Sequence, residues 1–134
     1  MNLFNFPLQI QSEILNRMEL SEIFSLSFCS QKTKEIIRNH WMIPLKMHIQ
    51  LVPSDSNQTV FSIGTDDDNL SKILISEREF LLEEDTVSLK FSDTVVLSCG
   101  VFWSSYGTVW IKYDPEDSPN AAITDYLKDL FSIE

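Results

Sequence analysis

The chain has 134 residues, with ten basic and twenty acidic side chains that give a formal net charge of −10 at pH 7. The hydrophobic fraction of 43% is that of a folded protein, and the length suits one domain or two very small ones. Three glycines exclude the glycine-rich loops that bind nucleotides, and two cysteines and two histidines are too few for a disulfide framework or a convincing structural zinc site. The negative charge also argues against a broad phosphate-binding surface.

The charge is unevenly distributed along the chain. Residues 1–50 contain five basic and four acidic side chains, whereas residues 51–134 contain five basic and sixteen acidic ones. This change from a near-neutral to a strongly acidic composition indicates a boundary between two regions. The most apolar run, residues 95–103, is about half as long as a membrane-spanning helix, and the N-terminus has no basic leader. We therefore expect a soluble protein of the cytoplasm and/or nucleus, with reduced thiols.

The first third of the chain has the apolar spacing of helices. Apolar side chains between Leu8 and Met18 recur at offsets of three, four and seven, and Pro7 suits the first turn of such a helix. Glu19-Leu20-Ser21 offers a break and an N-cap, and Ser30 is a third start signal. Three short helices are predicted. Each is too short to be stable alone, so their apolar faces need a partner surface.

Several positions of residues 6–38 agree in register with a known helical motif. They are Phe6-Pro7, Ile14-Leu15, Met18, Leu26-Ser27 and Cys29-Ser30. With these residues the segment resembles an F-box, the motif by which substrate receptors join SCF-type ubiquitin ligases. The run SFCSQKTK, residues 27–34, is similar to that of nematode F-box proteins. Leu20 stands where the family usually has a turn proline.

The resemblance implies that one apolar helical face binds a Skp-type adaptor, and through it a cullin scaffold, while the chain itself does no chemistry. The adaptor-binding residues that it implies are Pro7, Ile10, Ile14, Leu15, Met18, Leu26 and Cys29. Cys29 is expected to be a small buried filler rather than a reactive thiol, because no residues that could orient a base accompany it.

After Pro44 the period of the apolar residues changes from about 3.6 to 2, which is typical of strands. The predicted strands are residues 46–51, 59–63, 70–76, 87–91, 95–103 and 108–113. Residues 104–107 read as a four-residue hairpin loop, and helical spacing returns from Ala121. The predicted fold class is α+β. Residues 1–43 form a three-helix unit, and residues 44–134 form an acidic antiparallel β meander with a C-terminal helix.

Residues 46–51 and 123–131 are similar to segments of the F-box-associated region of nematode F-box proteins. That resemblance implies a shortened region of this kind, which binds a target protein. Four aromatic residues that gather near one predicted hairpin are the candidate target-binding residues: Phe102, Trp103, Tyr106 and Trp110. Packing against the final helix is the alternative explanation for them.

Other candidate sites have simpler explanations. Asp66–Asn69 could begin a calcium loop, but Ser71 stands where such a loop needs glycine, so a solvated turn is favoured. Glu83–Asp85 is likewise interpreted as a turn. Ser104 and Ser105 lack the motif of a nucleophile elbow. No catalytic residue, metal or cofactor is predicted.

The leading hypothesis is a substrate-recruiting adaptor subunit of an SCF-type E3 ubiquitin ligase, with an unknown protein target and no nucleic-acid or membrane partner. One alternative is a truncated regulatory F-box protein that occupies the adaptor without delivering a target. Another is a helix-turn-helix nucleic-acid binder that uses Lys32, Lys34 and Arg38 in residues 20–39, although the net charge opposes this.

Overall fold

The structure is a computed structural model of the whole chain. It describes residues 7–41, 43–53, 57–65, 70–78, 86–92, 94–103, 108–113 and 119–133. The N-terminal helices are α1 (Leu8–Arg17), α2 (Leu20–Leu26) and α3 (Gln31–His40). The strands are β1 (Lys46–Val52), β2 (Gln58–Gly64), β3 (Ser71–Arg78), β4 (Val87–Lys90), β5 (Val96–Trp103) and β6 (Val109–Tyr113), and the last helix is α4 (Asn120–Leu130).

The helix starts are formed by the residues that the sequence indicates. Glu19 precedes α2 in a capping box, in which its backbone N–H donates to Oε1 of Glu22 at 3.1 Å. Ser30 precedes α3, and its Oγ accepts a hydrogen bond from the backbone N–H of Thr33 at 3.0 Å. Pro119 precedes α4. The Glu19 and Ser30 caps provide partners for backbone N–H groups at the helix starts, so the predicted breaks between the N-terminal helices are confirmed.

The six strands form one sheet in the order β1-β2-β3-β6-β5-β4. Two three-stranded antiparallel meanders, β1-β2-β3 and β4-β5-β6, are joined by the parallel pair of β3 and β6, in which Leu74 lies opposite Val109. The predicted α+β fold class with a mostly antiparallel sheet is confirmed. The structure adds that the meander is interrupted after β3, because the chain crosses to the opposite edge before it returns to the centre.

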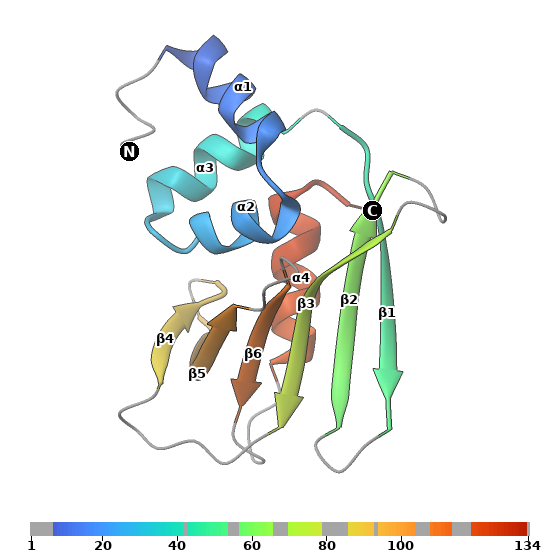
Figure 1. Cartoon of the computed structure of the whole chain (residues 1–134). Helices are drawn as coiled ribbons and strands as arrows, with labels where there is room; N and C mark the ends of the chain where they lie inside the picture. The colour runs from blue at the N-terminus through green and yellow to red at the C-terminus, as the bar shows by residue number, and fades with distance from the viewer. Residues whose placement is uncertain are drawn as a thin grey trace.

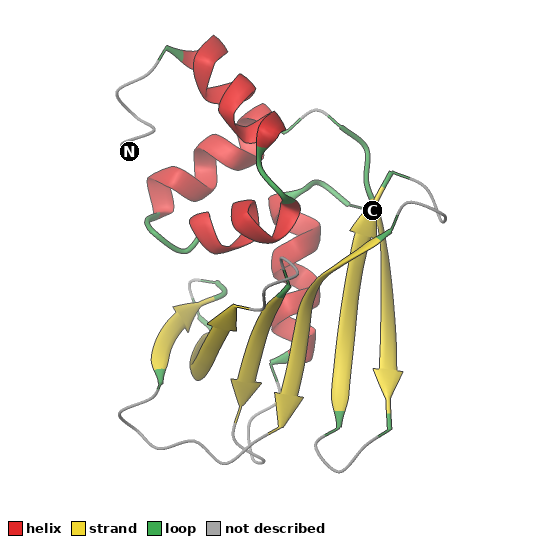
Figure 2. Ribbon diagram, in the orientation of Figure 1, coloured by secondary structure: helices red, strands yellow, loops and turns green. Residues whose placement is uncertain are grey.

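The helices are arranged in two groups around this sheet. Figure 1 shows α4 behind the sheet, with α2 and α3 beyond one end of the strands and α1 farthest from the sheet. In the same view, no described helix covers the face of the sheet that is turned toward the reader (Figure 2). None of the described helices combines the length and apolar character needed to cross a membrane.

A single buried cluster connects the N-terminal helices, the sheet and α4. Its members with the least exposed side chains are Leu15, Ile23, Phe24, Ile37, Phe61, Ile63, Leu74, Cys99, Val109, Ile111, Ile123, Leu127, Leu130 and Phe131. Burial of such apolar side chains is the main favourable contribution to folding. The predicted boundary between residues 43 and 44 lies between α3 and β1, and the core is continuous across it.

Candidate protein-binding surfaces

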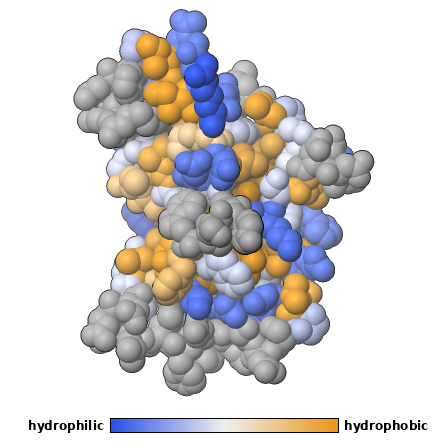
Figure 3. All heavy atoms as spheres, in the orientation of Figure 1, coloured by the Kyte–Doolittle hydropathy of each residue, from blue (hydrophilic) through white to orange (hydrophobic). Residues whose placement is uncertain are grey.

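The outer surface of α1 holds the first group of predicted adaptor-binding residues. Pro7 is exposed, and the Ile10 side chain retains 40% of its accessible surface. Ile14 and Met18 are partly buried against the core. Figure 3 shows hydrophobic atoms beside a strongly hydrophilic strip on this helix at the top of the molecule. An exposed isoleucine on the outermost helix is a suitable anchor for a protein partner.

Leu15 differs from these residues because it is only 1% exposed. It lies on the inner side of α1, within the core shared by the helices and the sheet. Its role in the described structure is therefore to hold α1 in place. Direct contact between Leu15 and a separate adaptor would require α1 to move.

The end of α2 corrects the prediction for Cys29. The thiol is exposed and unpaired with the other cysteine, so Cys29 is not a buried filler. Its backbone N–H donates to the Leu26 carbonyl at 3.0 Å in the turn that ends the helix. In this turn the partly buried Phe28 points into the core instead, and Leu26 is also partly buried. The larger aromatic ring buries more apolar surface than a thiol would, which explains why Phe28 and not Cys29 points into the core.

Phe28 belongs to an aromatic cluster that joins α2 to the rest of the fold. Its ring stacks on Tyr126 of α4 with centroids 4.6 Å apart, and it meets Phe91 edge to face at 5.6 Å. Phe24 completes the cluster, 5.1 Å from Phe28 and 5.9 Å from Tyr126. Offset and edge-to-face aromatic pairs each contribute about 0.5–1.5 kcal/mol beyond burial. The cluster therefore fastens the helical unit to both the sheet and α4.

The Tyr126 hydroxyl adds a polar contact inside this apolar cluster. Ser27 donates its hydroxyl proton to the Phe24 carbonyl at 2.5 Å, which leaves the Tyr126 O–H to donate to Ser27 Oγ at 2.6 Å. Burial raises the pKa of Tyr126 to about 12, because the phenolate would lose its hydration there. Tyr126 is thus neutral under ordinary conditions and serves as a hydrogen-bond donor.

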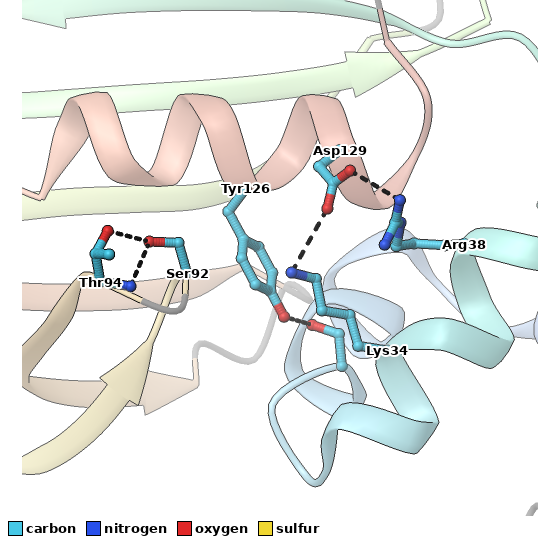
Figure 4. A network of polar contacts seen from close by, with 7 residues as sticks. Lys34, Arg38, Ser92, Thr94, Tyr126 and Asp129 are labelled. Carbon is cyan, nitrogen blue, oxygen red and sulfur yellow. Dashed lines mark hydrogen bonds and ion pairs between the residues drawn. The ribbon is translucent and has the colours of Figure 1, made fainter.

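Ion pairs between α3 and α4 lie beside this cluster. The Asp129 carboxylate is 3.6 Å from Lys34 Nζ and 3.2 Å from an Arg38 guanidinium nitrogen, as Figure 4 shows. Lys34 Nζ also lies 4.4 Å from the centroid of the Tyr126 ring. Two of the three cations on which the helix-turn-helix alternative depended therefore face α4 and an acidic partner. This arrangement does not favour phosphate binding by α3.

The turn between β4 and β5 presents Phe91 to the aromatic cluster. Phe91 N–H donates to the Val95 carbonyl at 2.9 Å, and Ser92 Oγ accepts from the backbone N–H groups of Thr94 and Val95 at 3.3 and 3.1 Å. Figure 4 shows Ser92 and Thr94 on the other side of Tyr126 from Lys34. These bonds hold the turn so that Phe91 is only 4% exposed.

The predicted target-binding aromatics are divided by the structure. Phe102 and Trp110 are cross-strand partners, and Phe102 is 45% exposed, with Lys112 Nζ 5.0 Å from its ring centroid. Trp110 is half-buried and lies between Val109 and Ile111, which are in the core. Because side chains alternate along a strand, Phe102 and Trp110 lie on the opposite face of the sheet. Packing against α4 therefore does not explain these two residues.

Of the other two predicted aromatics, the structure describes the backbone of one. Trp103 lies in β5 opposite Val109, and Tyr106 lies outside the described residues. The acidic segments 66–69 and 83–85, and Ser104 and Ser105, also lie outside them. Within the part of the chain that is described, no three His, Cys, Asp or Glu side chains are grouped so that they could hold a metal ion.

The helical unit matches a known family of domains. Residues 3–43 match the F-box domain, and this range contains α1, α2 and α3. The chain therefore contains an F-box domain, as the sequence resemblance predicted. Such a domain generally implies binding to a Skp-type adaptor, and proteins that carry it are typically adaptors rather than catalysts. No curated protein and no solved structure gives a significant match to the chain. The resemblance of the remaining residues to an F-box-associated region stays a prediction.

Proposed function

We propose that this protein is a substrate-recruiting adaptor subunit of an SCF-type E3 ubiquitin ligase. The observation that carries the proposal is the F-box match to residues 3–43, a range that contains α1, α2 and α3 at one end of the described fold. The protein would act by proximity and not by chemistry. It binds the ligase through one surface and presents a target protein on another.

The adaptor-binding surface in this proposal is the outer side of α1. Ile10 is its exposed anchor, with Pro7 beside the helix start. Ile14, Met18 and Leu26, which are partly buried against the core, are included in this surface as the resemblance implies. An adaptor that covered Ile10 would remove a large exposed apolar side chain from water. Leu15 supports the surface from within, and Cys29 contributes from the exposed turn after α2.

The target-binding surface in this proposal is the face of the sheet opposite the core. It includes Phe102 and Trp110, whereas Trp103 and Tyr106 remain predictions from the sequence on which this surface does not depend. The aromatic cluster and the Asp129 ion pairs support the proposal, because they hold the F-box helices firmly against α4. A firm connection keeps a bound target at a defined position relative to the ligase, which favours transfer to that target.

Co-purification with a Skp-type adaptor tests the adaptor surface. We expect the wild-type chain to bind, and Ile10→Asp to weaken binding at least about tenfold, because a carboxylate would be buried in an apolar interface. Ile10 is suited to this test because it is exposed, whereas a charge at the buried Leu15 would unfold the chain. Binding constants from titration calorimetry, with thermal melts of each variant, provide the measurement.

Val96→Asp is the matched control, since Val96 is 56% exposed and belongs to β5 of the sheet rather than to the F-box helices. It should bind like the wild-type chain. Wild-type affinity of the Ile10→Asp variant would show that the surface is wrongly assigned. Absence of binding by the correctly folded wild-type chain to any Skp-type adaptor would refute the proposed function itself.

A further inference from the structure

Among the described residues, one edge of the sheet is apolar and has no strand or helix paired along it. β1 is the first strand in the sheet order, and in this part of the chain it pairs with β2 alone. Ile49 and Leu51 in this strand are 40% and 73% exposed. An edge strand presents a row of backbone N–H and C=O groups to solvent, and folded proteins usually protect a long apolar edge with prolines, charges or a covering element. The seven residues of β1 contain no proline.

The side chains of β1 alternate between two chemically different faces. Met47 lies opposite Ile63 and Ile49 lies opposite Phe61, and both partners are buried in the core. The apolar residues Met47, Ile49 and Leu51 therefore share the face that carries α4. Lys46 and His48 lie on the other face. An added strand would meet apolar groups on one side and basic groups on the other.

A groove of about 850 Å³ lies between β1 and α4. Its described lining residues are Pro44, Leu45, Lys46, Met47, His48, Ile49, Thr124, Lys128, Ser132 and Ile133. They include two lysines and a histidine but no carboxylate, although the chain has twenty acidic and ten basic residues. Lys46 and His48 lie on one face of the edge strand and Lys128 lies on the α4 side, so the described residues along this edge are basic whereas the whole molecule is acidic. This inversion favours an acidic ligand.

We infer that β1 binds an extended acidic peptide in which apolar and acidic residues alternate, and that this peptide adds to the sheet as a further strand. Backbone hydrogen bonds to the open edge would supply affinity. The apolar side chains of the peptide would cover Ile49 and Leu51, and its carboxylates would lie near Lys46 and His48. Lys128 would attract the peptide from the α4 side of the groove.

A second copy of this chain is a poorer occupant of the same edge. Two copies that paired through β1 would bring two sets of Lys46, His48 and Lys128 together, with no carboxylate among the described groove residues to compensate them. Charge complementarity therefore selects an acidic partner over a copy of the chain.

This groove lies apart from α1 and from the Phe102 and Trp110 face. Peptide binding to β1 does not depend on the proposed ligase function. The further step, that the bound peptide is a segment of a ubiquitylation target, does rest on that function. The two ideas can fail separately, because adaptor binding is measured at α1 and peptide binding is measured without any adaptor.

The test uses a fluorescein-labelled, end-capped peptide in which valine and glutamate alternate over the length of β1, titrated with the full chain and followed by fluorescence anisotropy. We expect saturable binding that weakens as salt is added. A peptide with lysine in place of glutamate should bind at least about tenfold more weakly. In the protein, Leu51→Lys should weaken binding of the glutamate peptide by a similar factor, because it places a charge on the apolar side of the strand.

Val87→Lys is the matched control, since Val87 is 51% exposed on β4, the opposite edge strand. It should bind the peptide like the wild-type chain. The inference is overturned if the folded chain does not bind the glutamate peptide, if Leu51→Lys leaves binding unchanged, or if the lysine peptide binds equally well. A wild-type dimer in sedimentation velocity that Leu51→Lys abolishes would also overturn it, in favour of a second copy.

Discussion

At the scale of single residues, Tyr126 is the point where the F-box helices meet α4. Its ring stacks on Phe28, lies beneath Lys34, and its hydroxyl donates to Ser27. All three partners come from a short stretch that includes the end of α2 and the beginning of α3. A single side chain of α4 thus makes apolar, cationic and hydrogen-bonding contacts with the F-box domain.

The raised pKa of Tyr126 predicts a loss of stability in alkali. Its value of about 12 in the folded chain exceeds the ordinary value of 10.0, so the unfolded chain releases the proton first as the pH rises. The associated stability is complete below about pH 10 and is lost as the pH approaches 12. We expect Tyr126 to lower the free energy of unfolding by about 2–3 kcal/mol over this range. Urea denaturation of the wild-type chain and Tyr126→Phe at matched pH values measures this contribution.

In Tyr126→Phe, the free energy of unfolding should lack the part of its decrease in alkali that comes from Tyr126, since phenylalanine has no ionisable proton. Tyr113→Phe removes another buried phenol, which is 6% exposed, and controls for the loss of a hydroxyl as such. An equal decrease in the wild-type chain and in Tyr126→Phe would contradict the assignment.

At the scale of elements, α4 is held at both ends. At its start, the Asn120 side chain accepts a hydrogen bond from the Ser76 hydroxyl and donates one to Thr59 Oγ1 at 3.0 Å. At its end, Phe131 meets Trp41 with ring centroids 5.1 Å apart, and Asp129 pairs with α3. α4 therefore contacts both the sheet and the F-box helices, in addition to the direct contacts between α2 and the sheet.

Asn120→Ala should lower the free energy of unfolding by about 2–3 kcal/mol. Ser76 is fully buried and Thr59 is 2% exposed, so the substitution leaves two buried hydroxyls without this partner, and each such loss costs about 1–3 kcal/mol. Ala121→Ser, at an exposed position of the same turn, should change stability by less than about 0.5 kcal/mol. Equal stabilities of the two variants in guanidinium denaturation would show that Asn120 does not anchor the helix.

At the scale of the whole molecule, the near-neutral and acidic regions share one core. Residues from α1, α2 and α3 lie in the same buried cluster as residues from the sheet and α4. The uneven charge along the sequence therefore does not correspond to two separate hydrophobic cores. The near-neutral F-box helices pack directly on the acidic part and exchange ion pairs with it.

We expect a single unfolding transition as a consequence of this shared core. Helical circular dichroism and tryptophan fluorescence should give coincident denaturation curves. Phe28→Ala, within the connecting aromatic cluster, should shift both curves together and cost about 2–3 kcal/mol. Phe102→Ala, on the exposed face of the sheet, should cost less than about 1 kcal/mol. Two resolved transitions would show instead that the F-box helices and the sheet unfold independently.

Much of the secondary structure could be predicted because hydrophobic periodicity is local. The strand predicted at 46–51 is observed as β1 (Lys46–Val52), and the helix predicted from Ala121 begins at Asn120. The prediction for Cys29 failed because neighbouring residues in a turn point in different directions, and only the tertiary contacts of Phe28 with Tyr126 and Phe91 show that Phe28 is the one that points inward. Tyr126 lies on the apolar face of α4 with Ile123 and Leu127, so its burial could have been predicted from the spacing. Its contacts with Ser27 and Phe28 could not.

Resemblance to a family motif indicated the F-box domain that residues 3–43 match. The pattern of apolar and capping residues determined where the helices and strands lie and which of their faces are apolar. Periodicity and capping residues act over a few neighbouring positions, so these features need no knowledge of distant contacts. Only the tertiary structure decided that β3 pairs with β6, that Ser27 meets Tyr126 across 99 residues, and that β1 is an apolar edge strand of the described sheet. A period of two shows that one face of a strand is buried, but any strand with a matching face can become its neighbour. The choice depends on how all the faces are buried together.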